Sequence, residues 1–432
     1  MPFRYLTTLV LMLTLLPVSA ADAEKKTASS KEGWAVTPLP AIGYDSDFGF
    51  MAGGFVDINC YGGLYPNYKH RICLEALVYS KHANCYMLQY DSKYLIPGIR
   101  TNARIYFDNN PLYSFYGFNG FVNDYDASLN LNKDKGIAFY SYDRKFLNAR
   151  IDLEGELSAN LDWMAKVQWW HYWIRELGWK GYDHDNTLFR QYLKYGLIED
   201  SESSGGSVFE LQAGLKYDTR DIESAPSRGI YADVSLSAAP DINGSGYDYL
   251  KLAAHFRQYI SLGTDKIVLA YNLAYQGTLW GNPPFYAQSA IMHFKPSDGL
   301  GGATTLRGVL YNRVVGNDYL WGNVELRTRI FDKEIFRRRV CGVITPFFDA
   351  GMLTNPFRFD RQARAMYDNQ SAEDYDSFRS SLLEKACQPH LSYGIGTQLI
   401  IDYNFIPTLM FGIPFDSRDG KYGIYMTIDY TF

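Results

Sequence analysis

The sequence YGIYMTIDYTF, residues 422–432, ends the chain and alternates between two kinds of side chain. Large apolar and aromatic residues occupy every second position: Tyr422, Ile424, Met426, Ile428, Tyr430 and Phe432. The positions between them hold Gly423, Tyr425, Thr427, Asp429 and Thr431. Because successive side chains of a β-strand point to opposite faces, this pattern predicts a strand with one face toward lipid and the other toward water.

The same alternation with period two recurs along the chain, separated by turn-rich gaps. One such strand is weak evidence, since an edge strand of a soluble sheet alternates in the same way. The repetition predicts an all-β fold, a transmembrane antiparallel β-barrel of sixteen strands, an even number as in single-chain bacterial barrels. We expect strands near residues 41–58, 70–80, 84–94, 99–108, 112–122, 140–157, 162–176, 206–217, 229–239, 247–260, 265–280, 317–331, 338–352, 389–402, 404–413 and 422–432.

The connections between these strands fall into two length classes. The short ones are expected at the periplasmic end, together with both chain termini: Lys81–Ala83, Asn109–Pro111, Ala159–Leu161, Ser261–Asp265 and Asp332–Ile335. The long ones are expected at the outer end: Asn123–Ala138, Glu176–Ser204, Gly281–Gly316 and Thr354–Pro389. Short periplasmic turns with long external loops are typical of outer-membrane barrels.

The N-terminus predicts export. Arg4 precedes an apolar run that ends in small residues, so residues 1–20 are interpreted as a secretory signal peptide, with cleavage after Ala23 as the later alternative. A membrane anchor is disfavoured because the apolar run is too short to span a bilayer as a helix. Residues 24–40, rich in Lys, Ser, Thr and Glu, are expected to form a short flexible segment, and residues 41–432 the barrel.

Composition supports a barrel and excludes other classes. Aromatic residues make up 16% of the chain, which suits rings at membrane–water boundaries. The net charge is −5 without a basic block, so nucleic acid is not an expected partner. The five cysteines contain no Cys-x-x-Cys pair, which argues against a metal or redox site, although pairing among some of them stays open: Cys60, Cys73, Cys85, Cys341 and Cys387.

One segment carries a distinctive motif, DGLGGATTLRG at residues 298–308. A phosphate-binding loop is disfavoured, because the Gly-Lys-Ser/Thr ending is absent and no helix is expected to follow. The motif resembles the Val/Leu-Arg-Gly-Phe/Tyr signature of the BamA/TamA-type outer-membrane assembly barrels, the bacterial surface antigen superfamily. Further similar pieces follow the order of that family: Phe115–Asn119, Tyr217–Asp221, Pro226–Gly229, Pro284–Tyr286, Phe347–Gly351 and Tyr393–Gly396.

The chain departs from the family pattern at two points. Val309 occupies the aromatic position of the signature, with Tyr311 two residues later. No segment is available for the periplasmic POTRA domains that the family usually carries, so the resemblance points to its POTRA-less branch. The resemblance also implies that the C-terminal aromatics, Tyr430 and Phe432, form the signal read by the outer-membrane insertion machinery.

Arg307 and Gly308 lie in the long loop between the eleventh and twelfth strands, which we expect to fold inward. A charge left alone in a partly desolvated lumen costs several kcal/mol, so Arg307 needs partners. Glu325 and Asp349 on the following strands are the candidates, and the resemblance assigns the family's arginine-holding carboxylates to these positions. The alternative is an exposed loop arginine without a partner.

A second hypothesis concerns the seam between the first and last strands. Glycines there weaken strand pairing: Gly43, Gly49, Gly53, Gly54 and Gly423. The resemblance implies that such a seam opens sideways into lipid. The alternative is that these glycines only relieve crowding or permit bends.

These features lead to one function and its alternatives. We expect an integral outer-membrane barrel, not an enzyme, that assists insertion or translocation of outer-membrane proteins or lipids. The alternative is a passive channel or structural barrel. No cofactor or metal is expected, since Asp183–Asp185, Asp124–Asp126 and Glu373–Asp376 suit solvated loops. Expected partners are outer-membrane lipid and lipopolysaccharide, the machinery that inserts this barrel, and a separate periplasmic protein.

Overall fold

The computed structural model describes most of the chain after residue 31. The described residues are 32–62, 68–132, 136–178, 185–242, 246–291, 297–335, 338–369, 374–402, 405–428 and 430–432. The predicted signal peptide therefore lies outside the described residues. Within them, no helix has both the length and the apolar character needed to cross a membrane.

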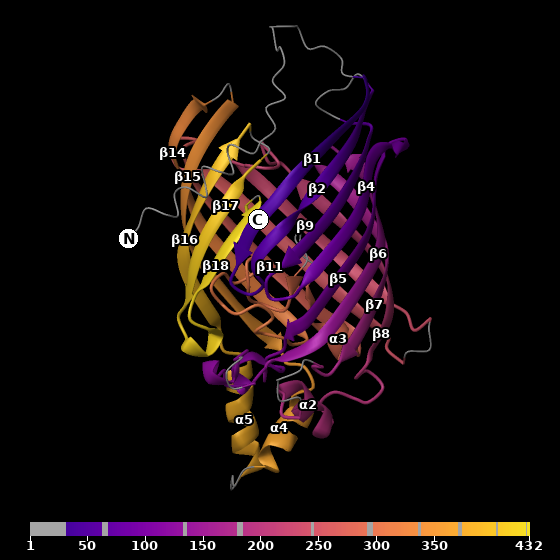
Figure 1. Ribbon diagram of the computed structural model, residues 1–432, viewed down its shortest axis with the longest axis vertical. Coiled ribbons are helices and arrows are strands. Elements are labelled where there is room, and N and C mark those ends of the chain that lie inside the picture. The colour runs from indigo at the N-terminus through magenta and orange to yellow at the C-terminus, as the bar shows by residue number, and fades with distance from the viewer. Residues whose placement is uncertain are drawn as a thin grey trace.

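Sixteen antiparallel strands close into a barrel in the described part of the chain, which confirms the predicted fold class (Figure 1). The first eight are β1 (Glu32–Asp45), β2 (Gly49–Gly62), β3 (His70–Tyr79), β4 (Asn84–Ile96), β5 (Ile99–Ser114), β6 (Ser141–Ser158), β7 (Leu161–Arg175) and β8 (Gly205–Asp218). The others are β9 (Gly229–Ala239), β10 (Tyr249–Ser261), β11 (Ile267–Gly281), β14 (Asp318–Ile335), β15 (Arg338–Asn355), β16 (His390–Ile401), β17 (Pro407–Pro414) and β18 (Gly423–Ile428). Sequential strands are neighbours, and β1 meets β18 to complete the wall.

The strands follow the predicted alternation between the two faces of the wall. On β11, Leu273 is 53% exposed on the outer surface, whereas the adjacent Asn272 and Ala274 are buried inside. On β8, Glu210 is buried in the lumen and Leu211 is exposed outside. Apolar side chains therefore face the lipid side and polar ones the interior, as expected for a barrel in a membrane.

The first predicted strand, residues 41–58, is wrong, because the structure has two strands there. The turn between β1 and β2 is stabilised by Asp45, whose Oδ1 accepts a hydrogen bond from the backbone N–H of Asp47 at 2.7 Å. Gly49 ends the turn with a φ of +84°, a conformation that side chains other than glycine rarely adopt. Since β1 starts at Glu32, the flexible segment predicted for residues 24–40 is also wrong over residues 32–40.

The strand predicted at 112–122 is wrong, because β5 continues from Ile99 through the predicted turn at Asn109–Pro111 and ends at Ser114, and residues 115–122 contain no strand. Pro111 removes a backbone donor, and the β5–β6 register shifts between Asn110 and Tyr113. The side chain of Asn110 accepts a hydrogen bond from the N–H of Leu112 at 3.1 Å, which compensates locally. The strand count was therefore right because one missed turn offset one false turn.

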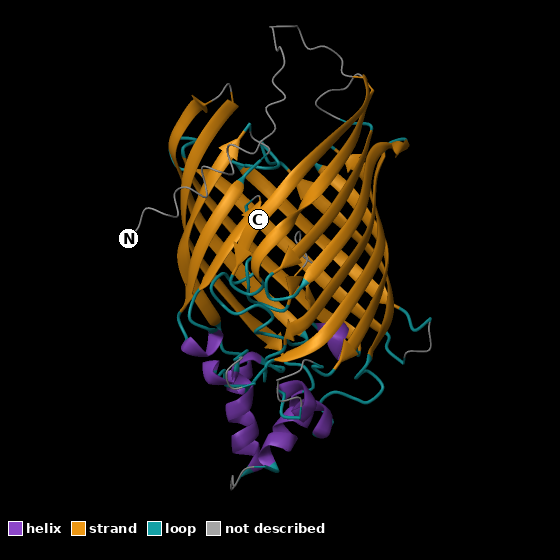
Figure 2. Ribbon diagram, in the orientation of Figure 1, coloured by secondary structure: helices purple, strands orange, loops and turns teal. Residues whose placement is uncertain are grey.

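The two ends of the barrel differ strongly (Figure 2). Helices and long loops gather at one end, the loop end: η1 (Gly120–Val122), η2 (Ala127–Leu129), α2 (Leu188–Lys194), α3 (Phe285–Gln288), α4 (Phe359–Tyr367), α5 (Tyr375–Ala386) and η3 (Ser417–Asp419). Most short connections lie at the opposite end, where β1 begins. The turn at Lys81–Ala83 was expected at that end, but it joins β3 to β4 at the loop end. The missed turn adds one strand before it, and each added strand moves the next turn to the other end of the barrel.

Candidate functional site

The lumenal loop connects β11 to β14, and its described residues, 282–291 and 297–317, run inside the barrel. It carries α3 and a short hairpin of β12 (Ala290–Ile291) and β13 (Ser297–Asp298). Five apolar residues of the loop are buried in one cluster with Trp321 of β14 and Leu353 of β15: Ile291, Leu300, Leu306, Val309 and Val314. The structure thus places this loop in the lumen, anchored by its own hydrophobic core.

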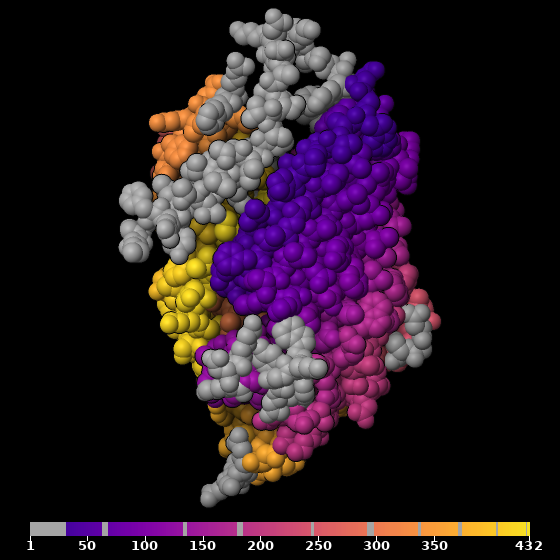
Figure 3. Space-filling model, viewed as in Figure 1, coloured from indigo at the N-terminus to yellow at the C-terminus, as the bar shows by residue number. Residues whose placement is uncertain are grey.

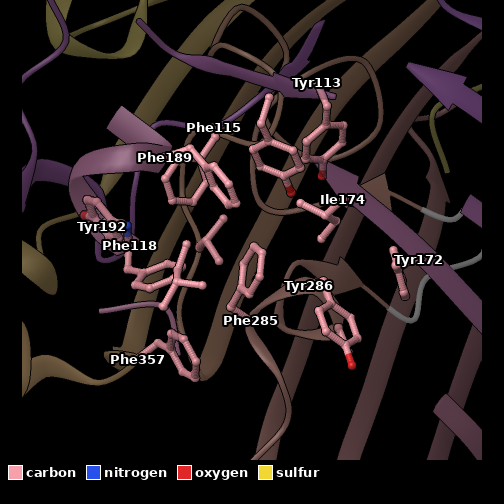
Figure 4. Close-up of a cluster of buried hydrophobic side chains, with 14 of the residues drawn as sticks. Tyr113, Phe115, Phe118, Tyr172, Ile174, Phe189, Tyr192, Phe285, Tyr286 and Phe357 are labelled. Carbon is pink, nitrogen blue, oxygen red and sulfur yellow. The ribbon is translucent and has the colours of Figure 1, made fainter. Parts of the chain in front are cut away.

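A cluster of buried aromatic rings, which we call the aromatic cap, packs at the loop end of the barrel (Figure 4). The cap consists of rings from several loops and strand ends: Tyr113, Phe115, Phe118, Tyr142, Phe189, Tyr192, Phe285, Tyr286 and Phe357. Many of these rings meet edge to face, as Phe118 and Phe357 do at 4.8 Å between centroids. Such pairs add roughly 0.5–1.5 kcal/mol each beyond the burial of their area, so the cap is a rigid layer.

Arg307 lies at the centre of the lumenal loop, with its side chain 1% exposed and its guanidinium between two carboxylates. Nη2 and Nε donate to the two oxygens of Asp349 at 2.7 and 2.9 Å, a two-pronged contact. Nη1 donates to Oε1 of Glu325 at 2.5 Å, and the ring of Phe347 lies 3.6 Å from the guanidinium carbon. Arg307 therefore contacts the two carboxylates, Glu325 and Asp349, that the sequence analysis named as its partners. Forked hydrogen bonds of this kind fix orientation as well as charge.

Gly308 brings the backbone of the lumenal loop against the barrel wall. A β-carbon at Gly308 would lie 2.6 Å from the carbonyl carbon of Gly412 on β17, and its φ is +100°. Its N–H donates to the hydroxyl of Tyr425 on β18 at 3.1 Å. Glycine at both positions permits this approach, which a side chain would block.

The seam is the boundary between β1 and β18, on the face where the indigo and yellow ends of the chain approach each other (Figure 3). In the described residues, the β1–β18 ladder contains the single pair Asp45 and Tyr425. Next to it, the backbone N–H of Ser46 donates to the carbonyl of Ile424 at 3.0 Å, and the hydroxyl of Ser46 accepts the N–H of Ile424 at 2.7 Å. On its other edge β1 pairs with β2 over all its residues from Glu32 to Asp45. The seam is consequently the weakest joint of the wall described here.

The lumenal loop touches both sides of the seam at the loop end. On one side, Tyr311 donates its N–H to Oδ1 of Asp47, in the β1–β2 turn, at 3.2 Å. On the other side, Leu310 donates its N–H to the carbonyl of Asp419, in the β17–β18 connection, at 2.9 Å. The loop therefore bridges the seam from inside, in addition to the contact of Gly308 with β18.

The predicted seam glycines do not all lie at the seam. Gly43 on β1 and Gly423 on β18 belong to the seam strands, whereas Gly49, Gly53 and Gly54 lie on β2. A β-carbon at Gly53 would come 2.0 Å from the carbonyl oxygen of Ala76 on β3, so this glycine relieves crowding. The seam hypothesis is wrong for these three residues, because the missed turn moved them one strand inward.

The chain terminus also differs from its predicted course. β18 ends at Ile428, and Tyr430 and Phe432 are buried instead of facing lipid. The guanidinium of Arg327 lies 3.8 Å from the Tyr430 ring centroid, and its Nη2 donates to the backbone oxygen of Phe432 at 3.0 Å. Arg327 also contacts Glu325, so the terminus turns inward onto the same charge network that holds Arg307.

Two further arginines anchor the lumenal loop, and sequence reasoning missed both. Arg313 is fully buried and donates to the carbonyls of Gly120, Asn123 and Arg418, which ties the loop to the aromatic cap and to the β17–β18 connection. Arg144 on β6 bridges Asp298 of the loop at 2.8 Å and Asp108 of β5 at 3.2 Å. Apart from Asp108 on β5, their partners lie in loops without periodicity, so no spacing in the sequence pointed to them.

The other candidate groups are not brought together. Asp183 and His184 lie outside the described residues, as does Glu373. Among the residues that the structure does describe, no group of three or more His, Cys, Asp or Glu side chains has the separation of a metal site.

A closed sixteen-stranded wall with an apolar outer surface, and with an arginine-bearing loop folded into the lumen, defines an outer-membrane-type β-barrel. The model of the Omp85 superfamily domain matches residues 77–432, and the chain belongs to this superfamily. This finding confirms the resemblance drawn from the glycine-rich motif. No curated protein matches in the sequence search.

Solved structures agree on the fold. The chain is similar to BamA from Haemophilus ducreyi lacking POTRA domains 1–3, with a TM-score of 0.56 and 17% identity over 93% of this chain and 71% of that one. It is also similar to CdiB from Escherichia coli, with a TM-score of 0.54 and 12% identity over 93% of this chain. The chain spans 64% of the length of that CdiB.

Proposed function

We propose that this Omp85-type barrel assists the insertion or translocation of outer-membrane proteins or lipids through its seam. The observation that carries the proposal is the contrast at β1, which pairs with β2 along its whole length and with β18 through one residue pair in the described chain. Backbone groups left unpaired at membrane depth cost several kcal/mol each, so such an edge is the place where the wall opens most easily.

Two contacts of the lumenal loop support local opening rather than general instability. Arg307, with Glu325 and Asp349, holds the lumenal loop on β14 and β15, next to β16–β18 and away from β1. The bridge from Tyr311 to Asp47 clamps the seam at the loop end only. The seam therefore opens most easily toward the end where β1 begins, while the aromatic cap keeps the loop end closed.

The location and partners of the chain follow from the same proposal. We place both chain ends in the periplasm and the loop end outside, because the helices and long loops gather there and short turns dominate the other end. The barrel would contact outer-membrane lipid and lipopolysaccharide, depend on the outer-membrane assembly machinery for its own insertion, and cooperate with a separate periplasmic protein. We assign it no catalytic role and no cofactor.

A second candidate function is a passive channel, and one observation favours it: a cavity of about 1720 Å³ lies in the lumen. Two measurements separate the candidates. Depletion of the protein from its cell should lower the amounts of other outer-membrane components if it assists their insertion. Purified barrel in planar bilayers should show steady ion conductance if it is a channel. Normal outer-membrane composition together with steady conductance would contradict our proposal.

A further inference from the structure

The lumenal cavity carries a group of neighbouring cations that the proposed function does not use. This cavity of about 1720 Å³ is bounded by the lumenal loop on one side and reaches the seam on the other. Arg104 on β5, Arg150 on β6 and Lys166 on β7 all line it. These three cations lie on adjacent strands and form what we call the basic wall.

Two cations of the basic wall are placed directly opposite each other. Arg104 and Arg150 are Cα partners in the β5–β6 ladder, and both side chains point into the lumen. Like charges at directly opposite positions destabilise a pair of strands. An anion bound between the two guanidinium groups would convert this repulsion into attraction.

In the described residues a single carboxylate lies within ion-pair distance of the basic wall, so one negative charge faces three cations. Asp152 is shared, since it lies 3.0 Å from Nε of Arg150 and 3.8 Å from Nζ of Lys166. In the described chain Arg104 has no carboxylate within ion-pair distance, its Nη2 donates to Asn148 at 3.4 Å, and its buried Nε has no hydrogen-bond partner. Glu75 on β3 also lines the cavity, without an ion pair to the basic wall. The guanidinium groups therefore have donors left for a ligand.

Carboxylates also line the cavity outside the basic wall, among them Asp108 and Asp298, which are paired with Arg144, but much of the remaining lining is apolar. The apolar part of the lining comes from the strands that adjoin β5 on the side of the seam: Leu39, Ala41, Met51, Phe55, Leu77 and Met87. Ligand pockets typically have volumes of roughly 300–1,000 Å³, so this cavity has room for a headgroup and acyl chains. A ligand that fits both surfaces has an anionic head and a hydrocarbon body.

The edge of β1 argues against an extended peptide as the occupant. Pro38 and Pro40 both line the cavity where it reaches the seam, and both pair in register with β2. A proline within a strand takes the position whose N–H would point away from the partner strand. Backbone N–H groups of a strand point alternately to its two edges, so Pro38 and Pro40 share the edge of Ser46, an even number of residues further on. Ser46 donates its N–H to β18, which shows that this edge faces the seam. Because proline has no N–H, Pro38 and Pro40 remove two backbone donors in a row from the edge of β1 that faces the seam. A peptide strand added at this edge would lack those two hydrogen bonds.

We propose that the lumenal cavity binds an anionic, phosphate-headed lipid. The phosphate lies between Arg104, Arg150 and Lys166, since guanidinium groups match phosphate oxygens in forked geometry. The acyl chains lie along the apolar inner surface of β1–β4 and reach the bilayer through the seam. This inference rests on the cavity and its charges, so it holds whether or not the barrel assists insertion of other molecules.

Trp170 provides the readout, because it lines the cavity on β7 beside the basic wall. The intact barrel, in neutral detergent, is titrated with phosphatidic acid that carries brominated acyl chains, which quench tryptophan fluorescence on contact. Phosphatidylcholine with the same chains is the neutral-headed comparison. A Trp170→Phe variant isolates the signal of this tryptophan from that of the other seven.

The variants remove positive charge either from the basic wall or from a lumenal cation outside the cavity. Arg104→Gln with Arg150→Gln removes the repelling pair, so folding is not expected to suffer. Lys216→Gln is the control, since Lys216 is a partly buried lumenal cation of β8 that is already paired with Glu154 and Asp162 and does not line the cavity. Each lost guanidinium contact should weaken phosphatidic acid binding about tenfold, hence about a hundredfold in the double variant.

Three results would overturn the proposal. The first is equal quenching of Trp170 by the two lipids. The second is unchanged binding of phosphatidic acid by the double variant, when its heat-modifiable mobility in gel electrophoresis shows that it is folded. The third is inorganic phosphate that binds as tightly as phosphatidic acid and displaces it, which would assign the basic wall to a free anion. Selective quenching by phosphatidic acid that is lost in the double variant and kept in Lys216→Gln is the expected result.

Discussion

The backbone of Gly308 in the lumenal loop lies directly against the backbone of Gly412 on β17. A β-carbon at Gly308 would lie 2.6 Å from the carbonyl carbon of Gly412, and one at Gly412 would lie 2.5 Å from the carbonyl oxygen of Arg307. This contact sets the depth at which Arg307 enters the lumen. It also places the N–H of Gly308 on the hydroxyl of Tyr425, next to the seam.

Gly308→Ala should therefore displace the loop and destabilise the barrel. The positive φ alone costs roughly 1–2 kcal/mol for a residue with a side chain, and the clash with Gly412 adds to it. Gly263→Ala is the matched control, since Gly263 has a φ of +73° and open space around it. The midpoints of urea unfolding compare the two. Equal losses of stability in both variants would show that the close approach has no energetic weight.

Arg307→Ala should cost about 3–5 kcal/mol of stability, because it leaves Glu325 and Asp349 buried without their common cation. Arg307→Lys keeps the charge but not the forked geometry, and an intermediate loss is expected. Arg175→Ala removes an exposed ion pair with Asp143 and should cost less than about 1 kcal/mol. Protease cleavage within the lumenal loop, measured together with unfolding, reports its release. An Arg307→Ala barrel with wild-type stability and loop protection would exclude a latch at this position.

The stability of the folded barrel should fall as pH rises, because Asp47 in the β1–β2 turn is buried beside another carboxylate. Burial, followed by the neighbouring carboxylate of Asp45, raises the pKa of Asp47 to about 8, against an ordinary value near 4. Lys81, whose ammonium opposes this shift, donates to the carbonyl of Asp47. Between pH 4 and 8 the folded barrel thus holds a proton that the unfolded chain lacks, so stability falls as pH rises through that window.

Asp47→Asn tests this directly, because the amide oxygen still accepts the N–H of Tyr311 but carries no charge at any pH. We expect the thermal midpoint of the wild type to fall relative to that of Asp47→Asn between pH 6 and 9. Parallel curves for the two proteins would mean that Asp47 does not titrate in this range.

Alternation and charge burial predicted much of this molecule. On β18 the predicted faces hold from Gly423 to Ile428, with Tyr425 buried inside. The same alternation failed at Tyr430 and Phe432, because the contacts of Arg327 with both residues outweigh exposure of the rings to lipid. Periodicity carries no information about a cation on a distant strand.

Some residues of the candidate site could likewise be predicted from the sequence, and others could not. Glu325 and Asp349 could be named because a buried arginine requires carboxylates and the motif resembles a known family. Arg313 could not, since its acceptors are backbone carbonyls of two other loops. The turn after Asp45 was missed although Asp-Ser-Asp-Phe-Gly, residues 45–49, has turn chemistry, because the apolar pattern on both sides continues through it.

The claim that the seam opens can be tested by locking it. The β-carbon of a residue at position 43 would lie 3.9 Å from that of Met426, within the range that a disulfide spans. Gly43→Cys with Met426→Cys, in a chain whose five native cysteines are serine, should form a disulfide across the seam. Val36→Cys with Ile58→Cys, between partners of the β1–β2 ladder, is the control lock.

The decisive measurement is the growth and outer-membrane composition of cells that depend on the seam-locked protein, with and without reductant. We predict that the oxidised seam lock reproduces the effect of depletion, that reductant reverses it, and that the control lock has no effect. Full function of a barrel whose seam disulfide is quantitatively formed would contradict the account.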